Sequence, residues 1–292
     1  MKLLQFFKEN KLHLGVATEL GILDVSEAGK KYNVSVPGSL QELLSAEDGM
    51  KTVEAVTSRA LEVKTTELFL SKEEIHYAPV VTNPEKIVCV GLNYIDHAKE
   101  SKMDIPTSPV IFSKFNNTLS AHLDYIPIPE GAKQIDYEAE LVVVIGKEAK
   151  NVSKEEALSY VFGYTIGNDV SARDLQFRTG QWLLGKSPDG FAPVGPFVVT
   201  SDEINPNNLN IECRINGEIR QKANTRDMIF DCATLVSYLS TYMTLKPGDL
   251  IFTGTPDGVI LGYAKDQQVW LKPGDEMVVS IEKLGELKNV LK

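Results

Sequence analysis

The sequence predicts an α+β fold in which strands outnumber helices. Short runs of aliphatic and β-branched residues recur along the 292 residues, and Gly, Pro and Asn-Gly turns separate them, as expected for strands and hairpins. Only a few segments combine a capping residue with the apolar spacing of a helix. Because helices do not alternate regularly with strands, we expect an α+β architecture rather than a succession of βαβ units.

The first 82 residues predict a small β-rich unit. Strands are expected at residues 3–7, 12–17 and 22–25. Ser39-x-x-Glu42 is a capping box, which predicts the start of one helix. Thr82–Asn83–Pro84 predicts a boundary between residues 1–82 and residues 84–292, because proline interrupts both helices and strands. The periodicity before this boundary is weak and assigns no function to the N-terminal unit.

The second unit contains stronger signals. Strands are predicted at residues 87–90, 136–146, 211–215, 218–221, 250–253 and 277–281. Asn216–Gly217 predicts a tight hairpin turn. Ser153-x-x-Glu156 predicts a helix through Val161, and Asp231 predicts a cap for a second helix extending to about residue 243.

Composition excludes several classes of protein. Lys and Arg number 30 against 40 Asp and Glu, and a net charge of −10 argues against nonspecific nucleic-acid binding. No apolar run approaches the roughly 20 residues of a membrane-spanning helix, so we expect no membrane association. The three cysteines are odd in number and show no C-x-x-C spacing, which predicts free thiols in a cytoplasmic protein.

Acidic residues alternate along one predicted strand. Asp136, Glu138 and Glu140 would share a face, because side chains alternate across a strand. A solvated strand edge would show the same alternation. Asp169 adds a fourth carboxylate in an otherwise apolar segment, and carboxylates without nearby His or Cys favour a hard cation. We therefore expect Mg²⁺, with Mn²⁺ or Ca²⁺ as alternatives.

Four motifs in one order make the resemblance to a known family specific. They are VGLNYIDH at 90–97, YEAEL at 137–141, NDVSARD at 168–174 and TGTPDG at 253–258. From about residue 84 to the end, the chain resembles the fumarylacetoacetate hydrolase family. The resemblance implies a mixed β-roll catalytic domain, a homodimer, and a Mg²⁺ site formed by Glu138, Glu140 and Asp169. Asp136 is not implied as a ligand, and we expect it to orient the site from behind the ligands.

His97 and Glu100 are the candidate general-base pair. Their spacing places them together on one helical turn, where a carboxylate can orient the imidazole and increase its basicity. On spacing alone, a solvated surface pair is the better interpretation. The resemblance implies that they activate water beneath a lid, here about residues 94–106, which closes over the substrate.

Four further residues are candidates for contact with an anionic substrate. Arg173 and Lys186 offer a bidentate fork and a point charge, whereas Gln176 and Thr255 offer neutral polar groups. Each alone could be an ordinary surface or turn residue. The resemblance implies a catalytic role for Lys186 and substrate binding by Arg173, Gln176 and Thr255.

One stretch matches a nucleotide-binding motif by its letters alone. Residues 180–187, GQWLLGKS, satisfy the phosphate-loop pattern. A phosphate loop follows a buried strand and opens a helix, but residues 174–179 are too polar for that strand, and Pro188 follows at once. We therefore do not expect a P-loop NTPase.

The resemblance implies a metal-dependent hydrolase that cleaves a C–C bond. Its expected substrate is a 2,4-dioxo acid of the acylpyruvate or fumarylpyruvate type, and pyruvate would leave as a metal-stabilised enolate. Oxaloacetate decarboxylation or isomerisation of a dienoic 2-oxo acid would use the same site. The alternative that is not an enzyme is a non-catalytic binding protein with the same fold. Leu92 stands where some family members carry Arg, so a second substrate carboxylate loses one contact.

Overall fold

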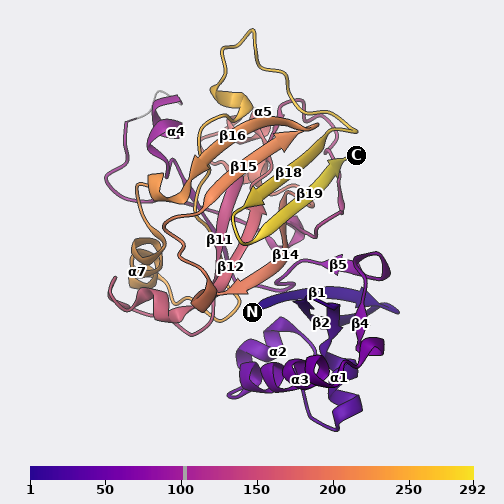
Figure 1. The fold of residues 1–292 in the computed structure, drawn as a ribbon. Helices are drawn as coiled ribbons and strands as arrows, with labels where there is room; N and C mark the ends of the chain where they lie inside the picture. Colours follow the sequence, from indigo (N-terminus) through magenta and orange to yellow (C-terminus); the bar gives the residue numbers. More distant parts are fainter. Residues whose placement is uncertain (101–103) are drawn as a thin grey trace.

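The computed structural model describes residues 1–100 and 104–292, and a large mixed sheet runs through both halves of the chain (Figure 1). Its strands follow the order β4-β3-β2-β1-β14-β12-β11-β17-β6-β7, with β5 on β1 and β8 on β14. From the N-terminus these are β1 (Lys2–Lys8), β2 (Lys11–Thr18), β3 (Gly21–Asp24), β4 (Phe69–Leu70), β5 (His76–Ala78), β6 (Ile87–Gly91), β7 (Val110–Lys114), β8 (Leu119–Ser120), β11 (Ala139–Ile145), β12 (Val161–Asn168), β14 (Ala192–Thr200) and β17 (Leu250–Phe252).

A second sheet lies in front of β11 and β12 in Figure 1. Its order is β16-β15-β18-β19-β9, and its strands are β9 (Tyr125–Ile126), β15 (Asn210–Ile215), β16 (Glu218–Asn224), β18 (Glu276–Ile281) and β19 (Gly285–Leu291). The hairpin predicted at Asn216–Gly217 joins β15 to β16, and both turn residues have positive φ, 50° and 83°. A short third sheet is formed by β10 (Ile135–Asp136) and β13 (Ser171–Ala172), which pair antiparallel.

The strand β11 separates two hydrophobic cores. All its residues are buried, and alternate side chains point to opposite faces of the sheet. Leu141, Val143 and Ile145 pack in the core shared with the second sheet. Val142 and Val144 pack on the other face, in a core that includes residues of the N-terminal unit. Because β11 is packed on both faces, it is a rigid support for the carboxylate of Glu140, its second residue.

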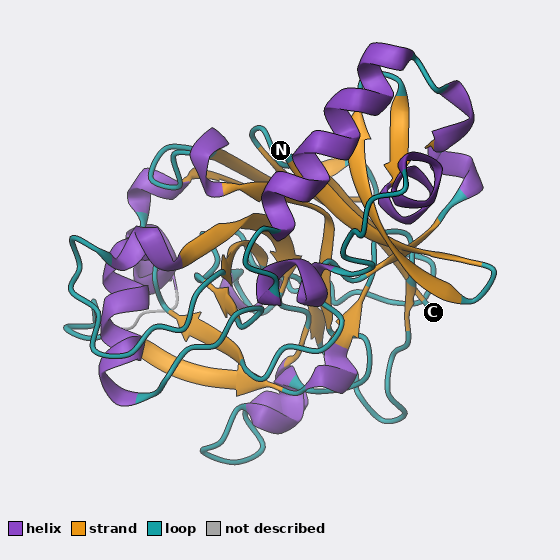
Figure 2. Ribbon diagram, turned by 90° about the horizontal axis from the view of Figure 1, so that it is seen from below, coloured by secondary structure: helices purple, strands orange, loops and turns teal. Residues whose placement is uncertain are grey.

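Helices lie around the outside of the strands in Figure 2. They are α1 (Val25–Tyr32), α2 (Leu40–Ser45), α3 (Gly49–Val63), α4 (Ile95–Glu100), α5 (Arg173–Gln176), α6 (Leu183–Lys186) and α7 (Cys232–Tyr242). Short 3₁₀ turns are η1 (Thr66–Leu68), η2 (Lys72–Glu74), η3 (Asn116–Thr118), η4 (Ala157–Tyr160), η5 (Ser201–Glu203), η6 (Thr225–Asp227) and η7 (Ile260–Gly262). No helix in the described parts of the chain is long and apolar enough to cross a bilayer.

The N-terminal unit contains more helix than the sequence predicts. The predicted α2 is present, and Ser39 Oγ accepts a hydrogen bond from the Glu42 backbone N–H. The prediction missed α1 and α3. Asp48 provides no side-chain cap for α3, so the usual start signal is absent, although buried Val53, Val56 and Ala60 mark its apolar face. Pairing of β1 with β14 joins this unit to the rest of the large sheet.

Two predictions in the second unit are wrong in detail. The predicted strand over residues 136–146 is interrupted at residues 137–138, between β10 and β11. The predicted helix over residues 153–161 is a turn followed by η4 and the strand β12. Ser153 Oγ does accept from the Glu156 N–H, at 3.3 Å. The turn does not propagate, because residues 161–166 are rich in β-branched and aromatic side chains that pair with β11. The second predicted helix is confirmed as α7, capped by Asp231.

Candidate active site

Three predicted carboxylates meet at one buried point. Glu138 lies in the interruption before β11, Glu140 is the second residue of β11, and Asp169 follows β12. Ala139 is paired with Asn168, which places the acidic end of β11 beside the end of β12. One carboxylate oxygen from each acid lies within 4.8 Å of the others, and all three residues are buried. The alternating pattern therefore does not mark a solvated strand edge.

Three buried cations surround these carboxylates. Lys186 Nζ lies 2.8 Å from Glu138 Oε2 and 2.7 Å from Asp169 Oδ2. Arg173 Nη2 donates to Glu138 Oε1 at 2.5 Å. Lys114 Nζ, which the sequence analysis missed, donates to Asp169 Oδ1 at 2.5 Å. Glu138 and Asp169 are thus held in fixed orientations from two sides each.

Asp136 lies outside the three-carboxylate cluster but supports it. Its Oδ2 accepts from Arg173 Nε at 2.9 Å and from the Leu261 N–H at 3.0 Å. Its Oδ1 accepts from the Ile260 N–H at 2.9 Å. Asp136 therefore fixes both Arg173 and the segment at residues 260–261.

Glycines permit the close packing that brings these groups together. A Cβ at Gly185 would lie 2.4 Å from the Gln176 backbone nitrogen, so only glycine lets α6 pack this closely on α5. Gly254 has a φ of +99°, and its N–H donates to Glu140 Oε2 at 2.6 Å. These contacts set the positions of Lys186 and Glu140.

Charge is unbalanced at this point, and Glu140 carries the imbalance. Asp136, Glu138, Glu140 and Asp169 face only three buried cations, and among the described residues no cation pairs with Glu140. Burial, reinforced by the negative charges of Asp169 and Glu138, raises the pKa of Glu140 well above its ordinary value. For Glu138, burial opposes ionisation, but Lys186 and Arg173 outweigh it and lower the pKa.

The residues present fit a divalent cation. Three carboxylates converge with oxygen atoms only, and that donor set suits Mg²⁺, Mn²⁺ or Ca²⁺. A divalent ion would also supply the positive charge that the buried cluster lacks, because it would turn one excess negative charge into one excess positive charge. An anionic substrate could then bind within this acidic protein.

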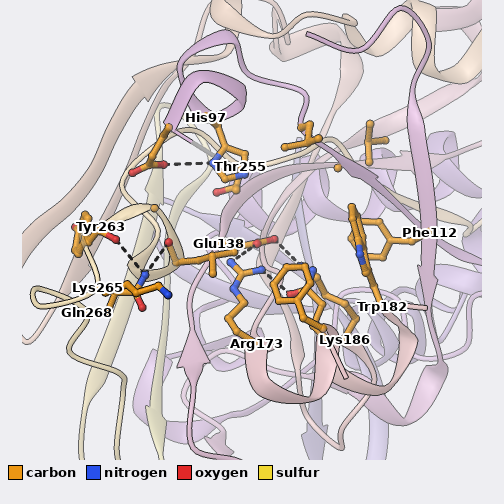
Figure 3. A pocket seen from close by; sticks show the side chains of 18 of the residues that line it. His97, Phe112, Glu138, Arg173, Trp182, Lys186, Thr255, Tyr263, Lys265 and Gln268 are labelled. Carbon is orange, nitrogen blue, oxygen red and sulfur yellow. Dashed lines mark hydrogen bonds and ion pairs between the residues drawn. The ribbon is translucent and has the colours of Figure 1, made fainter. Parts of the chain in front are cut away.

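The histidine and its acid lie above the cluster on α4. His97 Nδ1 is 3.4 Å from Glu100 Oε2, and His97 is only 7% exposed (Figure 3). Glu100 also accepts from the Gly258 N–H at 3.2 Å. A Cβ at Gly262 would fall within 2.3 Å of Glu100 Oε1, so this glycine leaves the space that the carboxylate occupies. Residues 101–103 of the predicted lid lie outside the described residues.

One cavity of about 650 Å³ connects the predicted residues. His97, Glu100, Glu138, Arg173, Gln176, Lys186 and Thr255 all line it. Gln176 accepts from Arg173 Nη1 at 2.8 Å, and Thr255 Oγ1 accepts from Gln221 Nε2 at 2.8 Å. Glu140 and Asp169 lie next to Glu138, at the buried end of the cavity. All nine predicted site residues are therefore near one another.

The walls of the cavity include residues that the sequence analysis did not single out. Phe112, Phe177 and Trp182 form an apolar wall, whereas Tyr263, Lys265 and Gln268 form a polar wall opposite Phe112 and Trp182 (Figure 3). Residues 180–187, which match the phosphate-loop pattern by their letters, contribute Trp182 and Lys186 to the same cavity. This stretch follows α5 rather than a buried strand, and its lysine, Lys186, is bound by two carboxylates.

Comparison with known proteins defines the class. Residues 86–292 match the family model described as fumarylacetoacetate (FAA) hydrolase C-terminal, and the chain belongs to this family. The strand-rich α+β fold that the sequence predicts is also that of solved family members. The structure of fumarylacetoacetate hydrolase from the psychrophile Exiguobacterium antarcticum matches with a TM-score of 0.82 and 34% identity, over 100% of this chain and 99% of that one.

Relatives match over nearly the whole chain. The fumarylacetoacetate hydrolase domain-containing protein 2 homolog of Dictyostelium discoideum is 43% identical, covering 97% of this chain and 94% of the relative. The mitochondrial oxaloacetate tautomerase fahd2 of Xenopus laevis is 39% identical, covering 99% and 89%. A solved maleylpyruvate hydrolase from Sphingobium sp. SYK-6 is 27% identical, with a TM-score of 0.78 over 100% and 99%. Enzymes of this family depend on divalent metals, and relatives of this chain include tautomerases, hydrolases and isomerases.

Proposed function

We propose that the protein is a divalent-metal-dependent enzyme that interconverts the enol and keto forms of a 2-oxo acid such as oxaloacetate. The observation that carries this proposal is the cavity itself. A buried carboxylate cluster with one unbalanced negative charge forms its inner end, and a His–Glu pair lies beside it. The likeness to an oxaloacetate tautomerase along nearly the whole chain supports the choice of reaction.

The inner end of the cavity would hold the 2-oxo acid group. A divalent cation bound by Glu138, Glu140 and Asp169 would act as a Lewis acid on the 2-oxo group and make the adjacent C–H more acidic. Lys186 would place its ammonium beside the oxygen on which negative charge develops. Arg173 would hold Glu138 and Gln176 in position, since its guanidinium already contacts both.

His97 would move the proton. With a proton on Nδ1 directed to Glu100, the imidazole has Nε2 free to exchange a proton with the substrate. Ketonisation removes the proton of the enol O–H and adds one to C3, so it consumes neither water nor a co-reactant. A single base that accepts one proton and returns another is sufficient.

Hydrolysis of a 2,4-dioxo acid is the second candidate. Two observations favour it. The pairing of His97 with Glu100 is what activation of a water molecule requires, and about 650 Å³ is more space than a four-carbon acid fills. The maleylpyruvate hydrolase among the solved structures supports this reaction. Oxaloacetate decarboxylation and dienoic acid isomerisation would use the same residues.

The assembly and the native metal form part of the proposal. We expect a homodimer with Mg²⁺ bound, because this is what the resemblance to the family implies. Light scattering of the purified protein measures the assembly, and elemental analysis of the protein purified without added metal identifies the ion.

Rapid mixing of the purified protein with enol-oxaloacetate tests the proposal. We expect ultraviolet absorbance of the enol to decay faster than in buffer, the acceleration to disappear on chelation, and Mg²⁺ to restore it. Glu140→Gln should abolish the acceleration, whereas Glu130→Gln, at an exposed acid, should not. An enol decay no faster than in buffer, together with hydrolysis of acetylpyruvate, would select the second candidate.

A further inference from the structure

We infer that Lys265 binds a second carboxylate of the substrate and makes the site selective for 2-oxo diacids. This inference rests on the proposed function, because it assumes that the 2-oxo acid group binds at the inner carboxylate cluster. It concerns the polar wall of the cavity, formed by Tyr263, Lys265 and Gln268.

Among the described Lys and Arg side chains that line the cavity, Lys265 is the one that forms no ion pair with a carboxylate of the protein. Arg173 is bound by Asp136 and Glu138, and Lys186 by Glu138 and Asp169. Among the described residues, no carboxylate lies within 4 Å of the Lys265 ammonium. A flexible ammonium without a partner can form an ion pair with an incoming anion without breaking an existing one, whereas Arg173 and Lys186 already hold carboxylates of the protein.

The backbone beneath Lys265 is anchored. Asp136 accepts from the N–H groups of Ile260 and Leu261, at 2.9 and 3.0 Å. Gln268 Nε2 donates to the carbonyls of Leu261 and Tyr263, at 2.9 and 3.0 Å, and so closes the loop across its base. The Gln267 N–H donates to the Ala264 carbonyl at 2.8 Å, which makes Lys265 a corner residue of a tight turn. The loop can therefore present the lysine from a defined place.

The two walls of the cavity determine which way the second carboxylate of the ligand points. Phe112 and Trp182 lie on the side of the cavity opposite Lys265, and the buried cluster lies between them (Figure 3). A charged second carboxylate would lose hydration without compensation against the aromatic wall, so it would turn to the polar wall. Leu92 also lines the cavity and offers no charge, which leaves Lys265 to supply it.

Paired ligands that differ only in the second carboxylate isolate this contact. Calorimetry with Mg²⁺ present would compare 2-oxoglutarate with 2-oxopentanoate, which has the same length but ends in a methyl group. We expect the wild-type protein to bind the diacid more tightly, and Lys265→Met to weaken diacid binding about tenfold or more while leaving the monoacid within about twofold. Lys265→Arg should retain most of the preference, and Lys147→Met, at an exposed lysine after β11, should retain all of it.

The outcomes separate the inference from the proposed function. The inference would be overturned if Lys265→Met weakened the binding of both ligands equally or left both affinities unchanged. It would also be overturned if the wild-type protein showed no preference for the diacid. Diacid-selective binding without turnover of enol-oxaloacetate would overturn the proposed function and leave the inference standing. Absence of binding for both ligands would overturn both.

Discussion

We expect Glu140→Gln to stabilise the metal-free protein, although Glu140 is a proposed metal ligand. Among the described residues of the metal-free protein, four buried carboxylates face three buried cations, and Glu140 is the carboxylate without a cationic partner. A glutamine amide is neutral and of the same shape, and its oxygen can still accept from the Gly254 N–H. The substitution therefore removes an unbalanced buried charge and keeps the hydrogen bond.

The expected gain in the metal-free state is about 1–3 kcal/mol, the order of the desolvation penalty of a buried polar group, because the substitution removes a buried charge that has a hydrogen bond but no cation beside it. Metal should act in the opposite direction. A ligand at 100 times its dissociation constant stabilises a folded protein by about 2.7 kcal/mol. The wild-type protein should show this gain with Mg²⁺, whereas the variant should show little.

Thermal unfolding of both proteins, with a chelator and with Mg²⁺, provides the assay. We expect the variant to melt higher than wild type in chelator, and we expect Mg²⁺ to raise the melting temperature of wild type but hardly that of the variant. Glu130→Gln serves as the control, because Glu130 is an exposed acid outside the cavity lining. Equal stabilisation of wild type and Glu140→Gln by Mg²⁺, or a metal-free variant less stable than wild type, would refute the reasoning.

Three further predictions concern other residues. His97→Asn should lower kcat about 10²–10⁴-fold in the enol-oxaloacetate assay while calorimetric binding of 2-oxoglutarate changes little, and an unchanged kcat would remove His97 from the proton transfer. Asp136→Asn should cost about 3–5 kcal/mol in urea unfolding, because Arg173 loses a buried partner, and a cost below 1 kcal/mol would contradict this role. Burial, with smaller effects of Lys72 and Lys288, lowers the pKa of His122 from 6.5 to about 4. Between pH 6.5 and 4 the unfolded chain therefore binds a proton at His122 more readily than the folded protein does. The contribution of His122 to the free energy of unfolding is complete above pH 6.5, and it should be lost as the pH drops toward 4. His122→Asn should reduce this acid sensitivity in urea titrations at several pH values, and an identical pH profile would contradict the assignment.

Local patterns predicted the parts of the site that lie on regular structure. Glu138 and Glu140 are two residues apart, and a period of two predicted that their side chains lie on the same side of the chain, although Glu138 comes just before β11 and not within it. The approach of Asp169 to them is a long-range contact. Its apolar setting indicated a fourth carboxylate of the site, and the resemblance carried by the four motifs implied that it joins Glu138 and Glu140. The spacing of His97 and Glu100 likewise predicted contact but not burial beside a cavity.

The missed residues have sequence contexts that do not distinguish them. Lys114 ends an ordinary strand, where a lysine usually reaches solvent, and its partners, Asp169 and the Val170 carbonyl, come from the segment after β12. Lys265 lies in a polar loop whose conformation depends on Asp136, about 130 residues earlier in the chain. The helix α3 lacks a side-chain cap, so packing rather than a start signal defines it.

Crystals grown with Mn²⁺ and a 2-oxo acid would test the central claim most directly. Anomalous scattering at the manganese absorption edge locates the ion without reference to the protein's activity. We expect one peak within about 2–2.5 Å of oxygen atoms from Glu138, Glu140 and Asp169, with the 2-oxo acid group beside it in the cavity. A cavity that binds the acid with no peak between these three carboxylates would contradict this claim.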